Sequence, residues 1–341
     1  MTNKRAFGFQ WHLTEKCDQK CKHCYSVAEQ KKRLVNDELN LSQCRVLVDK
    51  ILDFCKKTKC DPGIGISGGD PLLASHFWDV AAYLKEKGIK FSILGNPFHL
   101  DKATCDRLLN VGCRSYQMSL DGLEKTHDSV RKTGSFHATI NALNLLKSSG
   151  IRTAIMNTVT AENFSELIQL IHLATDMEVD LFGFARYCPT GLETVSMIEP
   201  SAYKGLLEEV WEKYSSLSDK NTIFSLKDHL FKLLLYEKGL LKPSKKKVVT
   251  DGCGCGVRHC AILPDGQIYA CRRFISPVGN LIASSMEEIF FGQEMAKYRE
   301  IESMEGCSDC ELLYQCRGCH ATSYGAFGSF FKKDPQCWRL L

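Results

Sequence analysis

Three cysteines stand close together near the start of the chain, with the spacing C-x3-C-x2-C: Cys17, Cys21 and Cys24. Their thiolates could bind three irons of a [4Fe–4S] cluster, which would leave the fourth iron without a protein ligand. Such an iron is open to another molecule, so we expect chemistry at this loop. Zinc is the alternative, but a structural zinc takes a fourth Cys or His. The nearest imidazole, His23, lies between two of the cysteines, where a neighbouring ligand is sterically awkward.

A second group of cysteines fills the last quarter of the chain, with glycines and turn residues between its members. The group consists of Cys253, Cys255, Cys260, Cys271, Cys307, Cys310, Cys316, Cys319 and Cys337. Eight thiolates would fully ligate two further [4Fe–4S] clusters, and two structural zincs are the alternative. The other six lie in or beside amphipathic segments and are predicted to be small buried hydrophobes: Cys44, Cys55, Cys60, Cys105, Cys113 and Cys188.

The overall composition is that of an ordinary globular protein of 341 residues, with 44% apolar and 25% charged residues. The net charge of +4 is mild, and the basic run at 242–247 is predicted to be a solvated linker, so no nucleic acid partner is expected. No apolar run approaches the roughly 20 residues that span a bilayer, and no signal-peptide core precedes the first strand. We expect a cytoplasmic protein without a membrane partner, in which disulfides are unfavourable.

Strands and helices alternate in the first two thirds of the chain. Apolar runs predict strands at 7–13, 63–67, 90–94, 115–119, 152–159 and 180–184, and helical spacing predicts helices at 41–57, 75–87, 101–110, 136–147, 163–175 and 201–216. Six β/α units predict a parallel sheet with helices outside, curved into an open, partial (β/α)6 TIM-like barrel. The loops that follow the strands should then meet at one mouth.

The composition divides the chain into three parts. Residues 1–216 form the predicted barrel, and 217–250 form a helical bridge (a helix at 226–239) and the basic linker. Residues 251–341 form a small cysteine-rich domain with a hairpin at 261–271 and a helix at 286–298. The last part is expected to be organised by metal rather than by a large core.

The first cysteine loop resembles the signature of the radical S-adenosylmethionine superfamily, with His23 where an aromatic residue is usual. The resemblance implies that the open iron binds S-adenosylmethionine and that the reduced cluster cleaves it to methionine and a 5′-deoxyadenosyl radical. Gly68-Gly69-Asp70-Pro71 resembles the family's glycine pair, which is more often followed by Glu. It implies close backbone approach to the ligand at Gly68 and Gly69, and an ammonium contact at Asp70. A plain strand-to-helix turn is the alternative.

Other positions match the family's cofactor site. Ser119 and Asp121 follow the fourth strand, where relatives place polar groups near the ribose and the methionine carboxylate. Arg131 matches an arginine that is common in the peptide-modifying branch, although a surface salt bridge would also explain it. Asn157 and Thr158, on the fifth strand, are expected to face the adenosine.

The C-terminal cysteines resemble the SPASM domain of radical peptide maturases, through Cys307-x2-Cys310-x5-Cys316-x2-Cys319 and the preceding Gly266-x4-Cys271. The resemblance implies three [4Fe–4S] clusters in all. The first auxiliary cluster would be held by Cys260, Cys271, Cys319 and either Cys253 or Cys255. The second would be held by Cys307, Cys310, Cys316 and Cys337.

The residue after Cys271 bears on the reaction. Anaerobic sulfatase maturases have an Asp there that acts as a base, whereas this chain has Arg272 followed by Arg273. An arginine cannot take a proton at neutral pH, which argues against the sulfatase role. The arginine pair suits an acidic peptide or a bound carboxylate, or else offsets cluster charge. The acid–base residue is left open, with His12, Tyr25, Tyr187, Asp251 and Arg272 as candidates by position.

The stretch 10–14 resembles maturases of ribosomally made, cysteine-containing peptides, including a group associated with Ala-Cys-Gly repeats. The predicted activity is hydrogen abstraction from a peptide followed by oxidative crosslinking, preferably a Cys thioether. A carbon–carbon crosslink, a decarboxylation, a dehydrogenase of alcohols or thiols, and a zinc-stabilised binding protein are the alternatives. Expected partners are a precursor peptide and an electron donor such as flavodoxin or ferredoxin. Because few residues precede Cys17, the leader is expected to be read by a separate protein or by the barrel surface.

Overall fold

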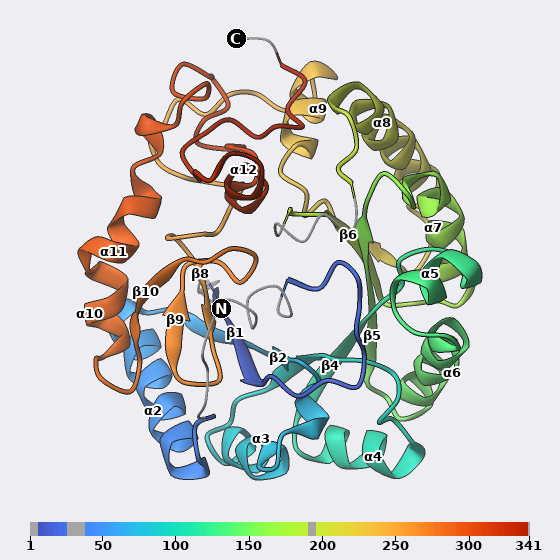
Figure 1. Ribbon diagram of the computed structural model, residues 1–341, viewed down its shortest axis with the longest axis vertical. Coiled ribbons are helices and arrows are strands. Elements are labelled where there is room, and N and C mark those ends of the chain that lie inside the picture. The colour runs from blue at the N-terminus through green and yellow to red at the C-terminus, as the bar shows by residue number, and fades with distance from the viewer. Residues whose placement is uncertain (1–5, 26–37, 190–195, 340–341) are drawn as a thin grey trace.

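One curved sheet of ten strands organises the molecule in the computed structural model, which describes residues 6–25, 38–189 and 196–339 (Figure 1). The strand order is β10-β9-β8-β1-β2-β3-β4-β5-β6-β7. The barrel strands are β1 (Ala6–Thr14), β2 (Asp61–Gly68), β3 (Phe91–Leu94), β4 (Cys113–Ser119), β5 (Arg152–Val159), β6 (Leu181–Arg186) and β7 (Ile223–Phe224). All neighbouring pairs from β1 to β7 are parallel, so their carboxyl ends share one edge.

Helices cover the outer face of this sheet (Figure 1). They are α2 (Leu41–Thr58), α3 (Phe77–Glu86), α4 (Lys102–Asn110), α5 (Glu124–Val130), α6 (Ser135–Ser148), α7 (Leu167–Asp176) and α8 (Pro200–Ser216), with short 3₁₀ turns η1 (Pro71–Leu73) and η2 (Phe164–Glu166). Nearly every residue of β1 is buried, as expected for a strand covered on both faces. The predicted partial (β/α)6 barrel is confirmed.

The bridge differs from its prediction. The strand β7 was not expected, and the predicted helix at 226–239 shortens to α9 (Phe231–Glu237). The residues between them form a turn around Asp228, whose carboxylate accepts hydrogen bonds from the backbone of Leu230 at 2.9 Å and from Arg186 at 2.7 Å. These polar contacts hold the segment out of a helix that its apolar spacing would otherwise favour.

The C-terminal region continues the barrel sheet. It contains β8 (His259–Ile262), β9 (Gln267–Tyr269), β10 (Pro277–Asn280), α10 (Met286–Phe291), α11 (Gln293–Ala296), η3 (Lys297–Arg299), η4 (Ile301–Ser303) and α12 (His320–Phe327). The strand β8 pairs in parallel with β1 and covers an edge that would otherwise be open. The predicted hairpin is present as β8 and β9, whereas β10 and α12 were not foreseen.

A buried ion-pair network ties this region to the far end of the barrel. Arg186, at the end of β6, binds both oxygens of Asp334 at 2.8 Å and also binds Asp228 and Gln336. The C-terminal region is thus attached at β1 and at β6, and it closes the gap between the two ends of the curved sheet (Figure 1). Within the described ranges, no helix is both long enough and apolar enough to cross a membrane.

Candidate functional site

The N-terminal thiol loop (Cys17, Cys21 and Cys24) leaves β1 and packs on the glycine turn after β2. The backbone N–H of Gly69 donates to Thr14 at 2.8 Å, and that of Asp70 donates to Lys16 at 2.7 Å. A side-chain carbon on Gly69 would lie 2.1 Å from the Lys16 carbonyl oxygen, which leaves no room for any other residue. The glycine pair therefore lets the thiol loop itself approach closely, a reason that the sequence did not suggest.

Arg131 links this loop to a buried carboxylate. Its Nε donates to Asp121 Oδ2 at 2.5 Å, and its Nη1 lies 3.6 Å from Cys21 Sγ. Burial disfavours the charge on Asp121, but Arg131 and the smaller contributions of its other neighbours together outweigh this effect and hold the pKa of Asp121 below its usual value. Asp121 also accepts from Thr158 N at 2.7 Å and lies 3.4 Å from His23 Nε2. Arg131 is therefore no surface salt bridge: it is an internal contact that orients the loop.

A second acidic group lies at the loop, and two of its three members, Asp18 and His99, were not predicted from the sequence. One ligand atom from each of Asp18, Asp70 and His99 falls within 4.8 Å of the other two. Asp70 is fully buried and accepts from Leu72 N and from Asn96 N, at 2.9 and 3.1 Å. Burial raises the pKa of Asp70 to about 6. Two carboxylates this close together favour a cation between them.

Asn157 and Ser119 lie at the carboxyl ends of β5 and β4. The Asn157 side chain donates to the Leu120 carbonyl at 2.9 Å. Its Oδ1 atom is buried and accepts no hydrogen bond from any part of the chain that the structure describes. Buried acceptors are rarely left unpaired, so this oxygen is suited to a ligand donor. Ser119 is half-buried as the last residue of β4.

Four thiols gather where the C-terminal region meets the barrel; we call Cys253, Cys255, Cys271 and Cys319 the inner thiol set. Cys253 and Cys255 lie within hydrogen-bond reach of each other, and Cys255 interacts electrostatically with Cys271 and Cys319. Cys253 and Cys255 are therefore both members, although the sequence predicted that only one of them would be.

The structure does not place Cys260, which the sequence predicted to be a cluster ligand, with this set. It lies on β8 opposite Phe9 of β1 and is fully buried. The ionisable group that interacts with it is Cys55 of α2, the helix that covers the outer face of the sheet. Because side chains alternate along a strand, Cys260 packs on the helix side, away from the inner thiols.

Cys188, predicted to be only a buried hydrophobe, adjoins the inner set. Its thiol lies 3.4 Å from Thr322 Oγ1 and within hydrogen-bond reach of Cys319. This contact raises the pKa of Cys188 well above, and lowers that of Cys319 well below, the usual thiol value. The guanidinium of Arg273 also lies 3.3 Å from Cys319 Sγ, which favours the thiolate form at Cys319.

A separate cavity is lined by the other four predicted ligands, Cys307, Cys310, Cys316 and Cys337, which we call the outer thiol set. The backbone N–H of Gly318 points at Cys316 Sγ at 3.4 Å, and Arg339 Nη1 lies 3.7 Å from Cys310 Sγ. These donors suit charged sulfur ligands. The structure brings together all four residues assigned to this site.

The acid–base candidates separate into two groups. The rings of His12 and Tyr25 lie 6.1 Å apart, and the Arg272 guanidinium lies 5.7 Å from the centre of the Tyr25 ring. Arg272 also donates to Gln10 on β1, so these residues share the mouth. The other two candidates do not take part in these contacts: Tyr187 is buried in the loop after β6, and Asp251 forms ion pairs with Lys232 and Arg258.

A pocket beside the inner set adds a cation that sequence reasoning missed. Its lining includes Phe184, Lys227, Arg273 and Cys319. Arg273 Nη2 lies 3.3 Å from Cys319 Sγ. Burial, together with repulsion from Arg272 and Arg273, lowers the pKa of Lys227 to about 7. No sequence signal marked Lys227, because its segment was predicted to be helical.

Comparisons with known proteins agree with this geometry. A model of the radical SAM superfamily matches residues 11–174, and a model of the iron–sulfur cluster-binding SPASM domain matches residues 253–311. The chain therefore contains a radical SAM domain and a SPASM domain. Radical SAM proteins are enzymes that use S-adenosylmethionine and a [4Fe–4S] cluster, and the SPASM domain indicates further iron–sulfur binding.

Named relatives of this radical SAM enzyme fall into two groups. The AdoMet-dependent heme synthase of Methanosarcina barkeri is 25% identical over 96% of this chain and 95% of its own length. The mycofactocin maturase MftC of Mycolicibacterium smegmatis is 27% identical over 96% of this chain and 81% of its own. Both matches span nearly the whole chain, so overall sequence similarity does not choose between the two reactions.

Solved structures share the fold. The crystal structure of Streptococcus suis SuiB bound to S-adenosylmethionine superposes with a TM-score of 0.77 and 20% identity, covering 98% of this chain and 78% of SuiB. Native anSMEcpe with bound AdoMet superposes with a TM-score of 0.73 and 17% identity, covering 97% of this chain and 93% of that one. At this identity the likeness concerns the fold alone.

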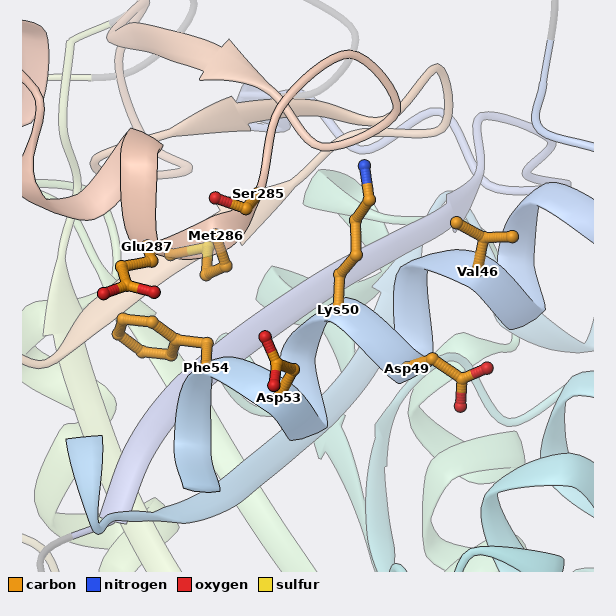
Figure 2. A pocket seen from close by; sticks show the side chains of 8 residues that line it. All are labelled: Val46, Asp49, Lys50, Asp53, Phe54, Ser285, Met286 and Glu287. Atoms are coloured by element: carbon orange, nitrogen blue, oxygen red, sulfur yellow. The ribbon is translucent and has the colours of Figure 1, made fainter. Parts of the chain in front are cut away.

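A larger groove of about 350 Å³ lies outside the radical SAM mouth, between α2 and α10 (Figure 2). Lys50 reaches away from its helix and donates to three backbone carbonyls, those of Leu281, Ile282 and Ser284, at 2.7–3.1 Å. Glu287 pairs with Lys57 at 2.9 Å. These charges join α2 to the C-terminal region and therefore have a structural role.

Proposed function

We propose that this radical SAM enzyme modifies a ribosomally made peptide by hydrogen abstraction and oxidative crosslinking. The observation that carries the proposal is the Arg272 contact across the mouth. Arg272 follows an inner-set thiol, binds Gln10 on β1 and packs on Tyr25, which directly follows Cys24. A substrate bound beside these residues would lie between the open iron and an electron acceptor.

We assign three [4Fe–4S] clusters to the described thiols. The N-terminal thiol loop would hold the first with one iron open, while the inner and outer thiol sets would hold one auxiliary cluster each with full ligation. Cys188 would donate to Cys319, and hydrogen bonds to sulfur are one way in which proteins adjust a cluster's reduction potential.

The residues around the loop fit S-adenosylmethionine, which supplies the radical when bound. Asp18 and Asp70 provide negative charge for its ammonium group, and the unpaired Asn157 Oδ1 can accept from the nucleoside. Arg131 holds Cys21 and Asp121 in place rather than meeting solvent. Asp121 is already paired with the Arg131 guanidinium, so its role is to position Arg131.

The preferred product is a Cys thioether. The substrate carbon would lose a hydrogen atom, a cysteine sulfur would bond to that carbon as its thiol proton leaves, and the inner thiol set would hold the cluster that supplies an acceptor for the surplus electron. The peptide therefore loses two hydrogens in all. A carbon–carbon crosslink or an alcohol or thiol dehydrogenation needs the same electron acceptor.

Its partners would be a precursor peptide, an electron donor such as flavodoxin or ferredoxin, and a leader-binding protein. Support for a peptide comes from relatives: MftC is named a maturase, and SuiB has been crystallised with its precursor peptide SuiA.

A second candidate function is action on a tetrapyrrole. The heme synthase match covers 95% of that relative, and an Fe-coproporphyrin III synthase of the same organism is 24% identical over 96% of this chain. The cations of the mouth suit the carboxylates of such a molecule as well as those of an acidic peptide.

Anaerobic turnover separates the candidates. The reduced enzyme would be incubated with S-adenosylmethionine and either the peptide encoded beside its gene or Fe-coproporphyrin III, and the mass and free-thiol count of each would be measured. A two-hydrogen loss with one thiol consumed supports the thioether, and an unchanged thiol count rules it out. About twelve irons per chain are expected; about three zincs and no 5′-deoxyadenosine would end the whole proposal.

A further inference from the structure

Lys227 stands out among the cations of the mouth because no carboxylate that the structure describes pairs with it. It lies in the turn between β7 and α9, and its side chain is exposed to the cavity although protein surrounds it. It forms neither a hydrogen bond nor an ion pair with any residue that the structure describes. An amine among other cations in such a place is stabilised in its charged form when an anion binds beside it.

The other charged groups of this pocket already have partners. Arg273 donates to Cys319 Sγ at 3.3 Å and to the Arg186 carbonyl, so it serves the inner thiol set. The carboxylate of Asp228 is taken up by Arg186 and by the backbone of Leu230. The pocket therefore offers a free amine and no free carboxylate, and its field favours an anion.

The pocket that Lys227 lines is also placed where a group of the substrate could bind. The strands β7 and β9 lie near opposite ends of the sheet order, yet the segments that follow them, which carry Lys227 and Arg273, line one pocket. The pocket thus lies where the sheet curves round to meet itself, beside the proposed electron acceptor.

We propose that Lys227, with Arg273 behind it, binds a carboxylate of the substrate and holds that substrate beside the inner thiol set. This rests on the proposed function, which it deepens by naming a carboxylate as the group recognised. The carboxylate belongs to a Glu or Asp side chain, to a peptide C-terminus or to a porphyrin, and the test distinguishes these sources.

The test is a binding titration with the anaerobic, iron-loaded enzyme. The probes are fluorescent hexapeptides with one Glu and a blocked C-terminus, their Gln counterparts with blocked and with free C-termini, and coproporphyrin III with its tetra-amide. Wild-type enzyme should bind at least one carboxylate probe at least about tenfold more tightly than its neutral partner. Lys227→Met should remove that preference, and Lys227→Arg should restore it to within about threefold.

Lys220→Met provides the matched control, because Lys220 is an exposed lysine that lies shortly before β7 and outside the pocket. It should bind every probe as the wild type does. Iron content and the reduction potential of the inner cluster are measured in each variant. If Lys227→Met loses iron or shifts that potential with probe binding unchanged, the lysine offsets cluster charge and the proposal is wrong.

Equal binding of carboxylate and neutral probes by the wild type would also overturn it, as would the absence of any binding. The proposed function is checked separately, by 5′-deoxyadenosine formation in wild-type enzyme without a substrate. That activity can fail while the carboxylate preference stands, and the reverse is also true, so the two failures are distinguishable.

Discussion

The N-terminal thiol loop and the outer thiol set use the same ligand type in opposite settings. Cys17 is exposed, and only three thiols stand on that loop. The outer set lines a cavity with four thiols, of which Cys316 is buried and the other three are partly buried. An incomplete ligand set leaves metal free to bind a reactant, whereas a complete one suits electron storage.

The inner thiol set combines features of both regions. Its thiols are numerous enough to close a cluster, yet Arg272 and Lys227 beside it face the mouth. Acidic groups accompany the first loop, namely Asp18 and Asp70, while cations accompany the inner set. The mouth is thus negative where a cationic cofactor would bind and positive where an anionic substrate group would bind.

The largest effects are expected when one thiol is removed from the N-terminal thiol loop or from the outer thiol set, which tests whether the two regions have different roles. Cys21→Ser should lose about a third of the iron and reduce 5′-deoxyadenosine formation to background, since the open iron is lost. Cys316→Ser should lose a similar share of iron but retain much of the substrate-free cleavage of S-adenosylmethionine. Iron analysis and chromatography of the nucleoside measure both. Cleavage by the Cys21 variant would contradict the assignment of the reactive site.

A second pair of variants tests membership of the inner set. Cys253→Ala should lose about a third of the iron, whereas Cys260→Ala should retain all of it, because Cys260 packs against α2. The Cys260 change removes only a buried sulfur and should cost about 1–2 kcal/mol of stability. Iron content and thermal unfolding distinguish the two effects. Loss of iron from the Cys260 variant alone would restore the assignment made from the sequence.

The third prediction concerns the joint between the barrel and the outer set. Arg186→Met leaves Asp228 and Asp334 buried without their cation, which should lower the free energy of unfolding by about 3–5 kcal/mol. Lys204→Met breaks an exposed pair with Glu237 and should cost less than about 1 kcal/mol. Urea unfolding under anaerobic conditions measures both. Equal costs would show that the buried network does not hold the region in place.

The order of most strands and helices could be predicted, because these elements are long enough to show the spacing of apolar residues typical of a strand or a helix. The strands of the barrel and both thiol-rich regions follow from alternation and spacing, and the carboxyl ends of parallel strands necessarily share an edge. The short strand β7 could not be predicted: two residues show no period, and the apolar run after them continued the helical pattern.

The parts of the site that could not be predicted depend on contacts between segments that lie far apart in the sequence. Cysteine spacing indicated which residues could ligate iron but not which face of β8 carries Cys260. Lys227 and Asp18 have ordinary local sequences, and they matter only because the fold sets them beside Arg273 and Asp70. Side-chain partners that depend on tertiary packing cannot be predicted from the local pattern of a single sequence.

The smallest expected effect is the pH dependence of S-adenosylmethionine binding, which tests the negative charge at the end of the mouth that holds Asp70. Asp70 has a pKa raised to about 6 by burial, so it is ionised above that pH and neutral below it. An ammonium group prefers the ionised form, so the affinity for S-adenosylmethionine should fall as the pH falls. Between pH 7.5 and pH 5.5 the ionised fraction drops to about one quarter, which predicts about fourfold weaker binding.

Equilibrium dialysis of the iron-loaded enzyme with labelled S-adenosylmethionine measures this change. Asp18 and His99 face the same point, so Asp18→Asn and His99→Gln are titrated alongside to remove their contributions. Asp70→Asn should bind more weakly at every pH and lose the slope assigned to Asp70, whereas Asp176→Asn, an exposed carboxylate on α7, should keep it. A slope that survives Asp70→Asn would assign the ammonium contact to Asp18 instead.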